Sequence, residues 1–169
     1  MSPDHKLGSS TPLWRLVLIA SLAGGLAEII WVSLYASFTP LEGATVAREV
    51  TASLFPRLAA GASGAWLGIA IHMTLALALG YAFAYVIWKP LVRARGPLAT
   101  LAVSALTLAA VWTVNFFLVL PLLNPAFILL MPYSVTFASK MLFAVAMGVV
   151  LAGASRGAVA GKISPRISV

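Results

Sequence analysis

The chain contains no cysteine, which excludes disulfides, thiolate metal sites and cysteine nucleophiles. Charged residues are scarce as well, at 9% of the chain, whereas they make up about a quarter of a soluble domain. Because 62% of the residues are hydrophobic, the chain lacks the polar side chains that would cover a soluble globule. The composition therefore predicts an integral membrane protein.

Motifs that mark common enzyme classes are also absent. The sequence has no Gly-rich phosphate loop, no HExxH motif, no nucleophile elbow and no pair of catalytic carboxylates. Three serines of the apolar segments, Ser104, Ser134 and Ser139, have only His72 available as a base. We therefore expect no enzymatic activity.

Cofactor and metal sites are disfavoured for a related reason. His72 has no second histidine within the apolar segments, so haem at this position would need a dimer or a methionine ligand such as Met73 or Met141. The carboxylates and His5 do not assemble the ligand spacing of a zinc site. We expect neither a cofactor nor a metal.

The net charge of +7 does not indicate a nucleic-acid partner. The basic residues lie almost entirely in loops and tails, and they form no basic face or aromatic-rich binding motif. We expect the lipid bilayer to be the main partner of the chain, and no nucleic acid to bind.

Four apolar segments are long enough to cross a membrane, since a spanning helix needs about 20 apolar residues. They lie at about residues 16–37, 65–88, 98–120 and 133–154 and leave few residues for a soluble domain. We predict an all-α fold, in which residues 1–169 form one transmembrane domain built as a polytopic four-helix bundle.

The distribution of Lys and Arg predicts the orientation. Eight basic residues flank one end of the predicted bundle and two flank the other, where Glu42 and Glu49 offset them. The eight are Lys6, Arg15, Lys89, Arg93, Arg95, Arg156, Lys162 and Arg166, and the two are Arg48 and Arg57. Both termini should therefore be cytoplasmic, and the Arg-rich tail is suited to contact with anionic lipid.

The first outer loop is predicted to contain a short amphipathic helix over about residues 40–55. Thr39-Pro40-Leu41-Glu42 has the pattern of a capping box with proline at the first helical position. Val46, Val50 and Leu54 then fall on one face of the helix. Such a helix would lie at the membrane surface as an anchor, or over the mouth of the bundle as a lid.

The third loop, residues 121–132, is apolar, uncharged and interrupted by three prolines. Irregular backbone at membrane depth must be shielded by protein. Three arrangements are open for this loop: a stretch that re-enters the outer leaflet, a docking surface for a partner, or an ordinary apolar turn.

Three of the four apolar segments carry an ionisable residue at a similar depth. With a rise of about 1.5 Å per residue, Glu28 lies roughly 2 Å, Lys140 about 4 Å and His72 about 6 Å outward of its segment's midpoint. Asn115, on the remaining segment, lies closer to the outer face. Because charge is costly in hydrocarbon, the sequence predicts an intramembrane polar cluster of Glu28, His72, Asn115 and Lys140.

Each ionisable residue also belongs to a stripe of small residues spaced by four. The stripes are Ala20-Gly24-Glu28-Val32-Ala36, Gly64-Gly68-His72-Ala76-Gly80-Ala84 and Thr136-Lys140-Ala144-Gly148-Ala152. Small side chains let helices approach closely in lipid. We therefore expect all three ionisable residues to face the interior of the bundle.

Two arrangements of the cluster follow from its charges. Glu28 and Lys140 can form an ion pair that fixes the order of the helices, with His72 bridging the pair or bonding to Asn115, Thr74 or a backbone carbonyl. Alternatively, Glu28 is protonated and water surrounds Lys140, which would indicate a proton path.

A resemblance to a known family rests on three stretches: Leu67–His72, with its Gly68-x-x-x-His72 spacing, then Gly80-Tyr81, then Asn115–Pro121. Over roughly residues 44–148 the chain resembles small four-helix inner-membrane proteins of bacteria, broadly the YagU-like and related families. The resemblance implies a location in the bacterial inner membrane, and it marks His72 and Asn115 as the positions of first interest.

Two functions are consistent with these features. In the first, the protein is a non-catalytic component of, or accessory to, a larger membrane assembly. Its small size, small-residue faces and apolar outer loop favour this interpretation. In the second, an oligomer transports a small solute or protons through Glu28, His72 and Lys140. Four helices are few for a transporter, and we find no inverted repeat between residues 13–88 and 98–155.

Overall fold

The structure, a computed structural model, describes the backbone of residues 12–163 and the side chains of residues 12–155. These residues are almost entirely helical and none of them is in a strand, which confirms the all-α fold class. Four helices are long and apolar enough to cross a membrane: Leu13–Ser37, Gly64–Arg95, Pro97–Leu123 and Tyr133–Ser155. The four predicted helices of spanning length are thus confirmed, and the chain is a multi-pass membrane protein.

The first and last of these helices are regular, and the middle two change their pitch. The spanning elements are α1 (Leu13–Ser37), α4 (Gly64–Ala82) with η1 (Phe83–Val92) and η2 (Arg93–Arg95), α5 (Pro97–Val114) with η3 (Asn115–Val119) and α6 (Leu120–Leu123), and α8 (Tyr133–Ile163). The short helices of the loops are α2 (Gly43–Leu54), α3 (Pro56–Ala59) and α7 (Pro125–Leu130).

Prolines account for the changes of pitch. The wide π-helical turns of η1 contain Pro90, and those of η3 end at Val119, two residues before Pro121. Proline has no N–H to donate, and its ring clashes with the carbonyl four residues earlier, so the regular ladder of hydrogen bonds is interrupted. The chain remains helical through both interruptions and keeps the length that a membrane crossing requires.

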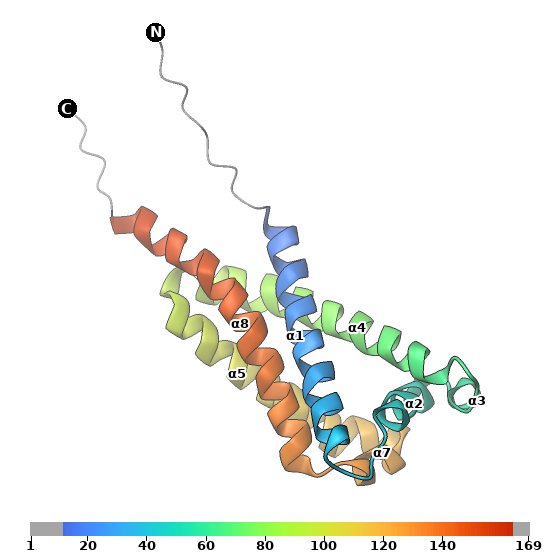
Figure 1. Cartoon of the computed structure of the whole chain (residues 1–169). Coiled ribbons are helices and arrows are strands. Elements are labelled where there is room, and N and C mark those ends of the chain that lie inside the picture. Colours follow the sequence, from blue (N-terminus) through green and yellow to red (C-terminus); the bar gives the residue numbers. More distant parts are fainter. Residues whose placement is uncertain (1–11, 164–169) are drawn as a thin grey trace, which may run out of the picture.

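The long helices are arranged in the order α5, α8, α1, α4 (Figure 1). The contacts of α8 with α1 and with α5 are the most extensive, and α4 packs on the other side of α1. The beginning of α1 and the end of α8 lie at the same end of the bundle as η1 (Figure 1). At the opposite end α4 diverges from α1, and α2 packs against it there (Figure 1).

The largest buried side chains gather where η1 meets α5 and α8. Trp88 is fully buried, and its indole N–H donates to the hydroxyl of Thr100 at 3.1 Å. That hydroxyl lies 3.0 Å from the hydroxyl of Ser155, so one polar chain joins three elements inside an apolar core. The same hydrophobic core extends along the bundle through Phe83, Leu108, Phe143, Met147 and Leu151. This core holds the ends of the helices together near the basic loop.

The outside of the bundle is apolar, as a membrane protein requires. Large exposed hydrophobic side chains occur on each long helix, among them Ile30, Val86, Leu106, Leu118 and Val149. A surface of this kind is stable against lipid or against another apolar protein surface and unstable in water.

Helix α2 begins at Gly43, three residues later than the predicted start near residue 40. The capping box is wrong: Glu42 stands at the N-cap without a side-chain cap, and the Thr39 hydroxyl donates instead to Tyr35 O of α1, at 3.2 Å. Helix α2 rests on α4, where a methyl group on Gly68 would collide with the carbonyl of Ala47. Its position relative to the bilayer surface stays a prediction.

The third loop is mostly helical. Asn124 separates α6 from α7, and its side-chain carbonyl accepts the N–H of Phe127 at 3.3 Å, which caps α7. Leu122 and Leu129 are 78% and 89% exposed on the outside of this loop. The orientation of the chain stays a prediction. His5, Lys6 and Arg166 lie outside the described residues, as do the side chains of Arg156 and Lys162.

Candidate functional site

Glu28 is the most deeply buried carboxylate among the described residues, with 5% of its surface exposed. It lies on α1, one turn beyond Gly24 and Gly25, which are also buried. A methyl group on Gly24 would meet the ring of Phe143 on α8, and one on Gly25 would meet Ala76 on α4. The two glycines therefore bring both neighbouring helices close to Glu28.

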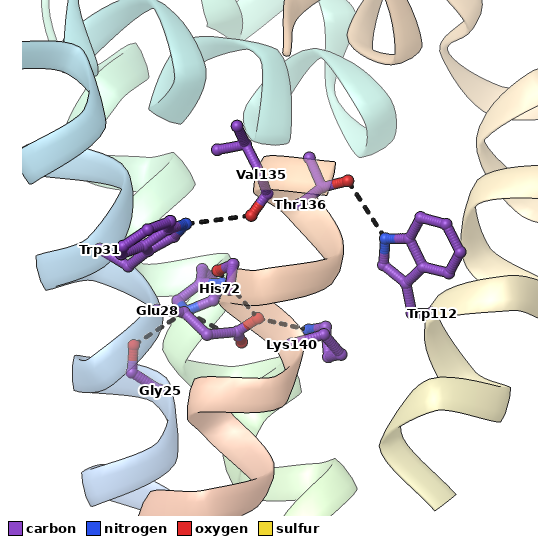
Figure 2. Close-up of polar contacts among 9 residues, drawn as sticks. Gly25, Glu28, Trp31, His72, Trp112, Val135, Thr136 and Lys140 are labelled. Carbon is purple, nitrogen blue, oxygen red and sulfur yellow. Dashed lines mark hydrogen bonds and ion pairs between the residues drawn. The ribbon is translucent and has the colours of Figure 1, made fainter. Parts of the chain in front are cut away.

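Lys140 of α8 neutralises this carboxylate. The ammonium Nζ lies 2.7 Å from Glu28 Oε1 (Figure 2). Ser139 donates to the same oxygen at 3.4 Å. Nζ also lies 5.6 Å from the centroid of the Phe143 ring, within the range of a cation–π contact. Glu28 and Lys140 therefore form a buried ion pair that joins α1 to α8.

His72 of α4 approaches the pair from the other side. Its Nε2 lies 3.9 Å from Glu28 Oε2 and 3.2 Å from the backbone carbonyl oxygen of Gly25 (Figure 2). With a proton on Nε2, the imidazole donates to that carbonyl and remains beside the carboxylate. Glu28, His72 and Lys140 thus come together from three spanning helices, with side-chain exposures of 6%, 26% and 19%.

Two tryptophans add hydrogen bonds on the side of the ion pair nearer the α8 start. The indole N–H of Trp31 on α1 donates to the carbonyl of Val135 at 3.0 Å (Figure 2). The indole N–H of Trp112 on α5 donates to the hydroxyl of Thr136 at 3.1 Å (Figure 2). These bonds fasten α1 and α5 to the first two turns of α8, next to Lys140.

The structure does not bring Asn115 into the cluster. Asn115 is the first residue of η3, and among the described residues its amide makes no side-chain hydrogen bond to His72, Glu28 or Lys140. Thr74 is not a partner of His72 either, because its hydroxyl donates to Ala70 of its own helix at 2.8 Å. Of the alternatives considered for His72, the backbone carbonyl is the one observed.

Sequence reasoning missed a second polar group, which joins the loop between the first two spanning helices to the loop between the last two. The amide of Asn124 donates to the Glu49 carboxylate at 2.9 Å, to the Glu49 carbonyl at 3.1 Å and to the Ser53 hydroxyl at 3.3 Å. These bonds tie α7 to α2. The signal in the sequence was Asn124 itself, since the side-chain amide of an asparagine in an apolar, uncharged loop needs hydrogen-bond partners.

Ser139, Gly25 and Trp31 also escaped prediction, although each is next to a predicted residue or within one turn of it. Their contribution depends on which helix faces which, and the sequence does not state that. No group of three or more His, Asp or Glu side chains is close enough to hold a metal within the described part of the chain.

Comparison with models of protein families finds no match to this chain, and neither curated proteins nor solved structures give a significant match. The resemblance to YagU-like proteins therefore stays a prediction.

Proposed function

We propose that this protein is a non-catalytic integral membrane protein that serves as a component of, or accessory to, a larger membrane assembly. The observation that carries the proposal is the exposed face of α5. Leu98, Ala102, Leu106 and Ala110 follow one another at intervals of four residues, and all four are exposed. The apolar stretch of α5 has the smallest buried share of the four long helices.

The composition of this face suits a protein partner as well as lipid. Alternating leucine and alanine leaves shallow recesses at Ala102 and Ala110, between Leu98 and Leu106, which are 79% and 70% exposed. Helices in lipid associate through such close-packed small positions because there is no hydrophobic driving force between them. A helix of a partner protein is therefore a suitable neighbour for α5.

The geometry of the polar cluster supports the same proposal. The Glu28 carboxylate is occupied by direct contacts with Lys140 and Ser139. A buried pair of this kind sets which helices are neighbours and at what register, because any other arrangement leaves a charge without a partner. In this role the pair makes the bundle a rigid platform for a partner.

We further propose a bacterial inner-membrane location with both termini in the cytoplasm. The support is the count of basic residues, eight against two, together with the resemblance of residues 44–148 to small inner-membrane proteins.

The test is the mass of the protein extracted in a mild detergent. We expect the wild type to elute within a complex larger than its own oligomers, and the variant Ala102→Trp/Ala110→Trp to elute without the partner. Two indoles on the α5 face fill the recesses that a partner helix would enter. The matched control is Ala70→Trp/Ala78→Trp, which places the same side chains on exposed positions of α4.

An unchanged complex in the α5 variant, or equal loss in both variants, would show that α5 is not the contact face. A wild type that elutes alone would overturn the accessory role. Each variant is first compared with the wild type by its thermal unfolding in detergent, so that loss of a partner is not confused with loss of the fold.

A second candidate function is proton or small-solute transport by an oligomer, and the observation that favours it is the exposure of His72. The imidazole is 26% exposed and lies 3.9 Å from a carboxylate that is only 6% exposed, so it is placed to carry protons between Glu28 and the bundle surface. In this case Glu28→Gln should fold normally and abolish proton flux into liposomes containing a pH-sensitive dye. Flux that is the same in wild type and variant would count against transport.

A further inference from the structure

Arg93 carries an unusual feature for a charged side chain. Its Nε is buried and has no hydrogen-bond partner. Among the side chains that the structure describes, no other buried nitrogen or oxygen lacks one. Buried donors almost always have a partner, and an unsatisfied donor on a charged group is especially costly. Arginine is always protonated, so it cannot avoid the cost by losing its charge. An anion bound by the rest of the guanidinium, which is not fully buried, would offset that cost.

The chain offers few negatively charged hydrogen-bond acceptors near Arg93. Lys89, Arg93 and Arg95 lie within seven residues, and no Asp or Glu occurs anywhere after Glu49. Glu28 is occupied by Lys140, and Glu49 is bonded to Asn124 in the outer loops. The basic loop thus has three cations and no carboxylate partner within residues 12–155.

Aromatic rings hold two of these cations in place. The guanidinium carbon of Arg93 lies 5.6 Å from the Trp88 ring, and Lys89 Nζ lies 5.7 Å from the Tyr85 ring. Trp88 is itself fixed by its hydrogen bond to Thr100. The rings orient the charged groups before any ligand arrives, so less side-chain entropy is lost on binding.

The surroundings of the cations indicate a lipid as the source of the anion. Val86 and Leu91 flank the loop and are 69% and 58% exposed. Tyrosine is enriched at the level of the headgroups at the ends of spanning helices, and Tyr85 is exposed beside the loop. Exposed apolar side chains next to fixed cations match acyl chains below a phosphate.

We propose that the loop joining the second and third spanning helices binds the phosphate of an anionic phospholipid. The guanidinium of Arg93 donates to a phosphate oxygen, and Lys89 and Arg95 supply further positive charge. The site fixes the ends of α4 and α5 to the headgroup layer. It does not depend on the proposed partner at the α5 face, because its residues lie at the end of the bundle.

Native mass spectrometry of the purified protein, titrated with phosphatidylglycerol or with phosphatidylcholine of the same chain length, tests the proposal. We expect phosphatidylglycerol to remain bound and Arg93→Gln to weaken its binding about tenfold, the loss of one charge-assisted hydrogen bond. The matched control is Arg57→Gln, which removes the same charge from the exposed helix α3 and should leave binding unchanged.

Three results would overturn the proposal. Equal weakening by Arg57→Gln would mean that general electrostatic attraction holds the lipid. Equal binding of phosphatidylcholine would mean that the anion is not recognised. Release of the lipid by millimolar inorganic phosphate would assign the site to a soluble anion.

Two further variants keep the test decisive if Arg93→Gln is unstable. Arg93→Lys retains the charge and loses the planar set of guanidinium donors, so undiminished binding by this variant would overturn the role of the guanidinium. Asp4, which lies outside the described residues, carries a further carboxylate of the chain. Tighter lipid binding by Asp4→Asn would show that Asp4 competes with the phosphate for Arg93, and unchanged lipid binding together with loss of stability would overturn the proposal.

Discussion

Replacing Lys140 by methionine is expected to destabilise the protein by about 3–5 kcal/mol, the cost of leaving one partner of a buried ion pair alone. Lys140 Nζ is the cation bound to Glu28 Oε1, at 2.7 Å, and Glu28 is 5% exposed. Methionine fills similar space and keeps an apolar stem, so the loss reflects charge more than packing. The measurement is the free energy of unfolding in mixed detergent micelles.

The control for charge is the exchanged pair, Glu28→Lys with Lys140→Glu. Each single change places two like charges together and should destabilise strongly, whereas the double variant should recover much of the stability. Glu28→Gln should lower the unfolding free energy less than Lys140→Met. The first variant leaves Lys140 without its partner at 19% exposure, whereas the second leaves Glu28 without its partner at 6% exposure. Equal stability of Lys140→Met and wild type would show that the pair does not fix the bundle.

Replacing Gly68 by alanine is expected to detach α2 from α4, with a loss of about 1–3 kcal/mol from overpacking. The added methyl group would collide with the carbonyl oxygen of Ala47, which belongs to the backbone and cannot rotate away. Separation of the helices also strains the hydrogen bond from the Thr51 hydroxyl to the Gly64 carbonyl, which measures 2.6 Å. Limited proteolysis by trypsin at Arg48 and Arg57 should accelerate in the variant.

Gly153 provides the matched control on α8. A methyl group at Gly153 meets no atom within 4 Å, and alanine is favoured over glycine inside a helix by about 0.5–1 kcal/mol. Gly153→Ala should therefore raise the unfolding free energy slightly, and Gly68→Ala should lower it. Changes of the same sign in both variants would mean that helix propensity outweighs the contact between α2 and α4.

Part of the site could be anticipated from depth alone. The rise of a helix is fixed, so residues at similar positions along their apolar segments lie at similar depth, and Glu28, His72 and Lys140 do meet. Asn115 was grouped with them although it lies further outward, and the structure leaves it apart at the start of η3. Depth says at which level a residue lies and nothing of the direction in which it points.

The small-residue stripes show the same limit. On α4 one continuous stripe serves several neighbours, because Gly64 lies against α3 and Gly68 against α2, whereas Ala76 and Gly80 lie against α1. A pattern of small residues predicts that some helix approaches closely, and it does not name the helix. The Asn124 group escaped notice for a similar reason, since its partners Glu49 and Ser53 are more than 70 residues away along the chain.

The sequence by itself determined that this is an all-helical membrane protein with four helices of spanning length, because apolar length and composition alone fix whether a helix is stable in lipid. It also determined which charged residues must find partners there. Only the tertiary structure decided the order α5, α8, α1, α4, the Gly25 carbonyl as the partner of His72, and the unpartnered Nε of Arg93. Apolar faces are interchangeable in sequence, and their shapes select a neighbour only when the helices pack together.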